Sequence, residues 1–208
     1  MKTYVSVVLA VFVVILSACS STATPVQEVA TEEVSPTQAS VSNSQKFYPL
    51  ATETGNADID VVLSAVASRE SQELINLFGY TTTACKTVNA LGGPPPCREG
   101  EAEGTMVEVL PFLGSEGSYF WKDEVDNFSG LNVIGLYAVY HVPATVFSDA
   151  NYPAGDYAIA YIGEDNLPEV VLQIADGKIV RIDYIFGYPE YNNFLTQDIT
   201  DFILEPLK

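Results

Sequence analysis

Over residues 59–66, apolar side chains recur with the period of a helix. A row at i, i+3, i+4 and i+7 predicts one buried face of a helix that begins near Asn56 or Asp58. A second helix is predicted to begin at Ser68 and to end at Gly79, since glycine tolerates the left-handed backbone that closes a helix. The predicted buried positions are Ile59, Val62, Leu63 and Val66 on the first helix and Leu74, Ile75 and Phe78 on the second.

From Thr105 onward the apolar period changes to two, which predicts strands. Asp176-Gly177 lies between the last two and predicts a two-residue hairpin turn, because such turns need positive φ. Residues 122–128 are predicted as a short helix and residues 190–204 as a closing helix. Short N-terminal helices followed by a curved antiparallel sheet make an α+β fold. The predicted strands are 105–112, 132–142, 155–162, 169–175 and 178–186.

The N-terminus has the pattern of a secretory signal peptide. Its apolar run over residues 5–16 is shorter than the about 20 residues that span a bilayer. The run ends at Leu16-Ser17-Ala18-Cys19, which resembles the lipobox of bacterial lipoproteins. The resemblance implies that the Cys19 thiol receives a diacylglycerol and that the chain is then cleaved before Cys19. This lipid, for which palmitate is the expected fatty acid, anchors the protein to a membrane of the cell envelope, outside the cytoplasm. Cleavage after Ala23, with release of a soluble protein, is the alternative.

Residues 20–45 lack aromatic and basic side chains and any run of bulky ones, so they cannot bury enough area to offset the entropy of ordering. They are predicted to be a disordered tether. The chain is therefore expected to comprise a signal peptide over 1–18, a lipidated cysteine and tether over 19–45, and one α+β domain over 46–208.

The chain carries 27 acidic and 9 basic residues, a net charge of −18. Such a surface repels nucleic acid phosphates, so no nucleic acid partner is expected. One histidine and three cysteines are too few for a histidine-rich or four-cysteine zinc site, and the chain lacks a Gly-rich phosphate loop. No metal or cofactor is predicted. The composition favours a non-enzymatic module that binds a ligand or another protein.

Cys85 and Cys97 are the thiols that remain once Cys19 is lipidated, and they are predicted to form a structural disulfide in an oxidising compartment. The loop between them contains Gly92-Gly93-Pro94-Pro95-Pro96, which forms neither helix nor strand and needs a clamp. A redox-active pair is the alternative, although such thiols usually occur as Cys-x-x-Cys. Recognition of this loop by a surface protein predicts an exposed apolar patch over residues 91–96.

Two short helices over 59–66 and 73–78, followed by a sheet that ends in Ala175-Asp176-Gly177-Lys178-Ile179-Val180-Arg181-Ile182, resemble the nuclear-transport-factor-2-like (SnoaL-like) family. The resemblance implies a cone, in which a curved sheet wraps around the early helices and leaves a pocket at its wide end. It also implies an alternative function, a hydrolase or isomerase in which His141 is a general base. The segment 80–97 resembles uncharacterised bacterial surface lipoproteins, which implies no activity. The candidate carboxylate partners of His141 are Asp126, Asp156 and Asp183.

Aromatic residues alternate on neighbouring predicted strands, with Tyr137 and Val139 expected on one face. They are predicted either to line a pocket for a small apolar or sugar-like ligand or to be ordinary core. His141 belongs to the same pocket or is a strand-end residue bonded to backbone or water. Acidic turns at 123–126 and 164–166 are predicted to be solvated, with weak calcium binding as the alternative. The candidate pocket residues are Trp121, Tyr137, His141, Tyr157 and Tyr161.

Overall fold

The computed structural model describes residues 47–88, 92–114, 116–164, 168–185 and 199–207. The chain divides into a unit over residues 1–42 and a unit over residues 43–208, and all described residues belong to the second. The predicted signal peptide, Cys19 and most of the predicted tether lie outside the described residues. None of the helices formed by the described residues is long and apolar enough to cross a membrane.

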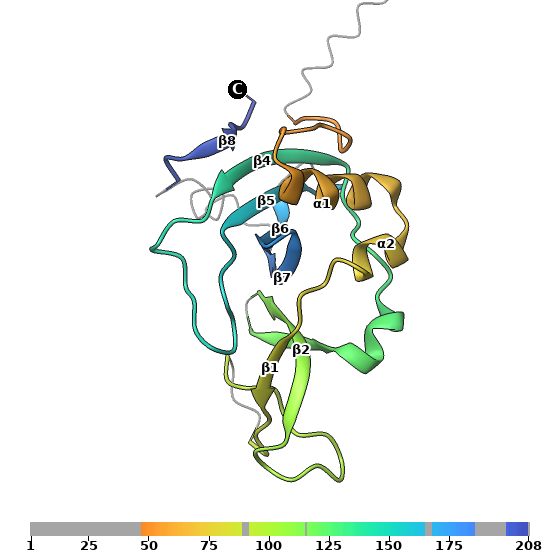
Figure 1. The fold of residues 1–208 in the computed structure, drawn as a ribbon, viewed down its shortest axis with the longest axis vertical. Helices are drawn as coiled ribbons and strands as arrows, with labels where there is room; N and C mark the ends of the chain where they lie inside the picture. Colours follow the sequence, from red (N-terminus) through yellow and green to blue (C-terminus); the bar gives the residue numbers. More distant parts are fainter. Residues whose placement is uncertain (1–46, 89–91, 115, 165–167, 186–198, 208) are drawn as a thin grey trace, which may run out of the picture. The chain divides into compact units, whose positions relative to one another are not determined.

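Helix α1 (Ala57–Ser68) confirms the first predicted helix and covers one face of the sheet (Figure 1). Asn56 is its N-cap, and the Asn56 side chain accepts a hydrogen bond from the Asp58 N–H at 3.0 Å. The approach to the helix is held by Asp60, whose carboxylate accepts hydrogen bonds from the Thr54 N–H at 2.7 Å and the Gly55 N–H at 2.9 Å. The four predicted positions of the apolar row are all buried.

Helix α2 (Ser71–Ile75) is shorter than predicted, and the predicted left-handed cap at Gly79 is wrong. The left-handed residue is Arg69, which ends α1 with φ 61°. Gly79 instead runs beside the last long strand, where its N–H donates to the Ile179 carbonyl at 2.8 Å. A Cβ atom at Gly79 would lie 3.2 Å from the Lys178 Cβ, so close backbone approach is the reason for glycine here.

The strands form one sheet with the order β1-β2-β7-β6-β5-β4-β8, and β3 pairs with β2. The α+β class is confirmed, as are the five predicted strands to within three residues where they are described. The Asp176-Gly177 turn is confirmed, with φ values of 51° and 67°. Residues 122–128, predicted as a short helix, form the 3-10 helix η1 (Lys122–Asn127). The strands are β1 (Thr81–Ala84), β2 (Met106–Leu113), β3 (Ser118–Trp121), β4 (Gly135–His141), β5 (Tyr157–Ile162), β6 (Pro168–Ala175), β7 (Lys178–Tyr184) and β8 (Phe202–Leu204).

The prediction of a purely antiparallel sheet is wrong at one place, because β2 and β7 are parallel. Val109 pairs with β1 and β3, while Phe112 pairs with β3 and β7. Strand β3 therefore pairs along one edge of β2. Along the other edge, β1 pairs with the first half of β2 and β7 pairs with its last two residues. The intervening strands β3 to β6 supply the long connection that a parallel pair requires. Neither β1 nor β3 was predicted, since each has four residues and no clear alternation.

The predicted closing helix is wrong over its described end, where Phe202–Leu204 form strand β8 on the edge of β4; residues 190–198 lie outside the described residues. Phe202 packs against the cluster on the outer face of the sheet, and Ile203 packs against the main core. Neighbouring side chains that face opposite sides are typical of a strand. Pairing also satisfies backbone groups that the edge of β4 would otherwise expose.

Two faces of the sheet are buried. The inner face packs on α1 and α2 and makes the main core, which includes Ile59, Leu63, Leu110, Ile159 and Leu172. On the outer face, buried side chains form two smaller clusters. The outer clusters are Ala138, Tyr140, Ala158, Ala160 and Val171, and near the disulfide Cys85, Val107 and Val109.

The Tyr161 hydroxyl is buried in the main core and has no hydrogen-bond partner among the described residues. Burial raises the pKa of this phenol, so it stays neutral. Replacing Tyr161 with phenylalanine is therefore expected to stabilise the domain by about 1–3 kcal/mol, because an unpaired buried polar group is removed. The measurement is the urea midpoint of unfolding, with Tyr157→Phe as the control at a half-buried tyrosine. A lower midpoint for Tyr161→Phe would contradict the prediction.

Candidate functional site

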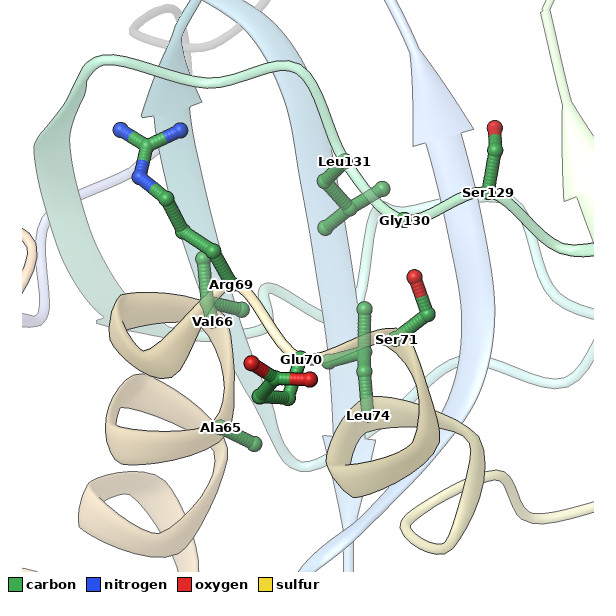
Figure 2. A pocket seen from close by; sticks show the side chains of 9 residues that line it. All are labelled: Ala65, Val66, Arg69, Glu70, Ser71, Leu74, Ser129, Gly130 and Leu131. Atoms are coloured by element: carbon green, nitrogen blue, oxygen red, sulfur yellow. The ribbon is translucent and has the colours of Figure 1, made fainter.

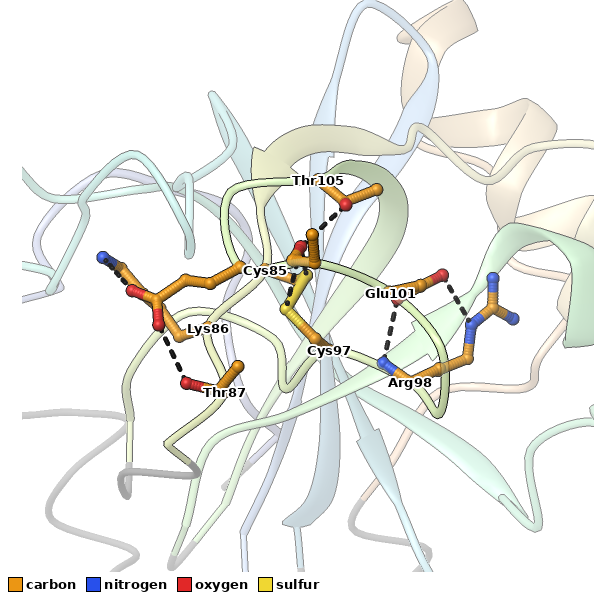
Figure 3. Close-up of a disulfide and its surroundings, with 9 residues drawn as sticks. Cys85, Lys86, Thr87, Cys97, Arg98, Glu101 and Thr105 are labelled. Carbon is orange, nitrogen blue, oxygen red and sulfur yellow. Dashed lines mark hydrogen bonds and ion pairs between the residues drawn. A yellow bond between two sulfur atoms is a disulfide. The ribbon is translucent and has the colours of Figure 1, made fainter.

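A disulfide between Cys85 and Cys97 closes the proline-containing loop, as predicted (Figure 3). Their Cα atoms are 4.9 Å apart, and Cys85 is completely buried against Val107 and Val109. Beside the disulfide, the Lys86 N–H donates to the Pro95 carbonyl at 3.0 Å and the Cys97 N–H donates to the Lys86 carbonyl at 2.8 Å. The two ends of the loop are therefore joined by backbone hydrogen bonds as well as by the covalent bond. A sulfur buried in packing is typical of a structural disulfide.

Arg98 follows the disulfide and links it to η1. Its guanidinium carbon lies 4.2 Å from the centroid of the Trp121 ring, and its Nη1 donates to both Asp123 carboxylate oxygens at 2.9 and 3.0 Å. The Arg98 Nε also donates to Glu101 at 3.3 Å. The hydrogen bond with Asp123 raises the pKa of Arg98, which keeps its charge. The first acidic turn, predicted to be solvated, thus pairs with Arg98 through Asp123 and, at 3.4 Å, through Glu124.

Weak calcium binding is the alternative prediction for the two acidic turns, 123–126 and 164–166. Among the described residues, no group of three or more histidine, cysteine, aspartate or glutamate side chains is arranged to hold a metal ion. The second turn, 164–166, lies outside the described residues except for Glu164.

Two tyrosines bind the disulfide loop, Tyr152 from the loop between β4 and β5 and Tyr119 from β3. The hydroxyls of Tyr119 and Tyr152 both donate to the Gly93 carbonyl, at 2.7 and 3.4 Å, and their ring centroids are 5.1 Å apart. Burial raises the pKa of both phenols, so both remain hydrogen-bond donors. A further hydrogen bond, from the Thr83 Oγ1 to the Asn151 Oδ1 at 2.8 Å, joins the β4–β5 loop to β1.

Arg181 on β7 donates hydrogen bonds to the same β4–β5 loop. Its side chain on β7 is 2% exposed and donates from Nη1 to the carbonyls of Phe147 at 2.8 Å and Tyr152 at 3.1 Å. Nε and Nη2 of Arg181 donate to the two Asp183 carboxylate oxygens at 2.7 and 3.0 Å. Gln173 completes the network: its Nε2 donates to Asp183 at 3.0 Å. A buried arginine thus has both a carboxylate and two backbone acceptors, which compensates for its desolvation.

We call residues 85–88, 92–106 and 143–155 the loop cluster. It is the part of the described chain where loops far apart in sequence are tied together by a disulfide, tyrosine hydroxyls and a buried arginine. Three large apolar side chains of the cluster are nonetheless exposed. They are Val88 at 73%, Met106 at 61% and Phe147 at 56%.

The apolar patch expected over residues 91–96 is not formed by the prolines as a group. Leu91 lies outside the described residues, Pro95 is buried and Pro96 is exposed. Val88, inside the disulfide-closed loop, and Met106, at the start of β2, are exposed instead. The sequence offered no signal for Phe147, Tyr152 or Arg181, because their roles depend on contacts between segments that are distant along the chain.

The predicted pocket residues lie in different parts of the structure. Tyr161 belongs to the main core, Tyr137 packs on the cluster at the outer face, and Trp121 lies near the disulfide. His141 and Tyr157 alone among the five lie together, with ring centroids 4.9 Å apart. The expectation that Tyr137 and Val139 share a face is wrong, because the register of β4 against β5 shifts between Leu136 and Ala138.

His141 is exposed at the end of β4. Its imidazole makes no hydrogen bond or ion pair within the described part of the chain, while its backbone N–H donates to the Asp201 carbonyl at 3.0 Å. Of its candidate partners, Asp183 is bound to Arg181, and Asp126 and Asp156 are exposed. The described residues therefore do not supply the paired histidine and carboxylate that the hydrolase or isomerase alternative requires.

No protein-family model, curated protein or solved structure matches this chain. The functional argument consequently rests on the geometry of the loop cluster and on the chemistry of its side chains.

Proposed function

We propose that this protein is a lipoprotein of the bacterial cell envelope, anchored to the membrane outside the cytoplasm by lipid at Cys19. Its domain acts as a non-enzymatic interaction module that binds another protein through the loop cluster. The observation that carries this proposal is the combination of fixed loops with exposed Val88, Met106 and Phe147 side chains. Loops that are already ordered lose little conformational entropy on binding, which favours recognition.

The position of Tyr48 supports an accessible loop cluster. Tyr48, near the start of the described chain, pairs with Leu136 on β4, and the Tyr48 hydroxyl donates to the Glu205 carbonyl at 2.8 Å. The start of the described chain thus lies at the β4 and β8 edge. Residues 92–105 lie beside β1 and β2, at the other end of the strand order (Figure 1). A structural disulfide also suits an oxidising compartment outside the cytoplasm.

A finer proposal concerns the fold. The order of two early helices followed by a sheet whose inner face packs on them supports a SnoaL-like cone. In this chain the inner face of the sheet is occupied by the main core. A SnoaL-like relationship would therefore be one of architecture, with the interaction surface on the loops rather than inside the cone.

Site-specific cross-linking tests the interaction module. The photoreactive residue p-benzoylphenylalanine is placed at Phe147 of the full-length chain in intact cells, and a discrete protein adduct is expected after illumination. Val61 is the matched control, because it is an exposed apolar residue on α1, outside the loop cluster. An adduct at both positions, or at neither, would contradict binding through the loop cluster.

The same cells test the anchor. Cys19→Ser removes the thiol that receives the lipid, so the protein is expected to move from the membrane fraction to the soluble fraction. Its retention in the membrane would contradict lipid attachment at Cys19. A loss of the Phe147 adduct in this variant would indicate that the partner is reached only from the membrane.

A further inference from the structure

Met106 brings a reactive thioether to the surface of the loop cluster. Its side chain is 61% exposed at the start of β2, and the residue opposite it on β1 is the small Ala84. The other methionine of the chain is Met1, in the predicted signal peptide. We propose that Met106 is a site of reversible oxidation, at which a sulfoxide forms and weakens the binding of the partner. This switch rests on the proposed function, because it regulates the same loop cluster.

No free thiol of the mature protein competes with the Met106 thioether for an oxidant. The chain has three cysteines. Cys85 and Cys97 form the disulfide, and Cys19 carries the lipid in the proposed function. Exposure and the chemical form of the sulfur decide which side chain is oxidised first. An oxidant that reaches the domain therefore meets Met106 as an exposed and unprotected sulfur.

The oxidant that fits this site is of the hypochlorous acid class. The sulfur lone pair attacks the chlorine, the Cl–O bond breaks and hydroxide leaves. Water then adds to the sulfur as chloride departs, and two protons are released, one of which neutralises the hydroxide. The thioether is thereby oxidised to the sulfoxide and hypochlorous acid is reduced to chloride. The net charge of −18 disfavours the approach of the hypochlorite anion, so the neutral acid is the reactive form.

Oxidation changes the surface that the partner meets. Methionine is flexible and apolar, whereas its sulfoxide is polar and loses free energy when it is buried without a hydrogen bond. Thr83, the neighbour of Ala84, donates from Oγ1 to Asn151 at 2.8 Å, so the strand beside Met106 contacts the loop that carries Phe147. A methionine sulfoxide reductase restores the thioether, which makes the switch reversible.

The modification itself is tested on the purified full-length protein with an equimolar amount of hypochlorous acid. Peptide mass spectrometry is expected to find the mass of one oxygen atom on the peptide that contains Met106, and a methionine sulfoxide reductase is expected to remove it. Met106→Leu removes the sulfur at similar volume and is expected to keep the wild-type urea midpoint, because the side chain is exposed. An unmodified Met106 beside other oxidised residues would overturn the site.

The photo-cross-link at Phe147 in intact cells tests the effect on binding. Met106→Gln carries an uncharged polar side chain in place of the sulfoxide, and its adduct yield is expected to fall at least about threefold. Met106→Leu is expected to keep the yield and to make it insensitive to hypochlorous acid. In the matched control, Met106→Leu is combined with Leu131→Met, which moves the thioether to a pocket of about 200 Å³ between α1 and α2 (Figure 2). Leu131 lies outside the loop cluster, so oxidation of this variant is expected to leave the adduct unchanged.

The outcomes separate the switch from the proposed function. A wild-type adduct yield in Met106→Gln, or an equal loss on oxidation in the wild type and in the Leu131→Met control, would overturn the switch and leave binding through the loop cluster in place. Absence of the Phe147 adduct in the untreated wild type would overturn both.

Discussion

Replacing Arg181 with leucine is expected to lower the free energy of unfolding by about 3–5 kcal/mol, the range found when one partner of a buried ion pair is removed. The change leaves the Asp183 carboxylate, 19% exposed, without its cation. It also removes the donors to the carbonyls of Phe147 and Tyr152. The measurement is equilibrium unfolding in urea, together with hydrogen exchange of the amides in residues 143–155.

Two further variants separate the causes of this loss. Arg181→Leu combined with Asp183→Leu is expected to recover part of the stability, because the unpaired carboxylate is gone. Recovery is expected to stay incomplete, since Phe147 and Tyr152 still lack their donor. Lys178→Ala, an exposed position on the same strand, is expected to change stability by less than about 0.5 kcal/mol. An equally small effect of Arg181→Leu would contradict the assigned role of Arg181.

Removing the disulfide is the second change with a large expected effect. A variant with both Cys85→Ala and Cys97→Ala is expected to lose about 3 kcal/mol of unfolding free energy, because the unfolded chain regains the freedom of a loop closed over a separation of 12 residues. The alanine at position 85 adds a smaller cost, since Cys85 is completely buried. Thermal and urea unfolding measure the change.

Reduction of the wild-type protein provides the control for the disulfide. A strong thiol reductant is expected to lower the wild-type midpoint toward that of the double variant and to leave the double variant unchanged. If reductant and substitution both leave the midpoint in place, the disulfide does not constrain the domain. The Phe147 cross-link gives a functional comparison, because Tyr152 binds the loop that the disulfide closes. The yield of the adduct is expected to fall with the double variant.

Local patterns determined much of this protein. The first helix follows from a row of four apolar residues and from an Asn cap. Both signals depend only on residues that are close together in the sequence. The turn at Asp176-Gly177 follows from the need for positive φ. The pairing of Cys85 with Cys97 followed from elimination of the third cysteine, and the structure confirms the pair. The lipid anchor and the interaction function stay predictions.

Tertiary structure decided three features that local patterns did not predict, because each depends on contacts between segments that are distant in the sequence. A register shift in β4 places Tyr137 on the opposite side from Val139, and so separates residues expected to line one pocket. Pairing with β4 makes Phe202–Leu204 a strand where periodicity favoured a helix. Arg181 lies on β7 between the apolar residues Val180 and Ile182. Its burial becomes tolerable because the loop that folds over it provides two carbonyl acceptors beside the Asp183 carboxylate. The spacing of apolar residues in the sequence indicates which face of a helix or strand is buried. Which other element packs against that face is decided by packing across the whole domain.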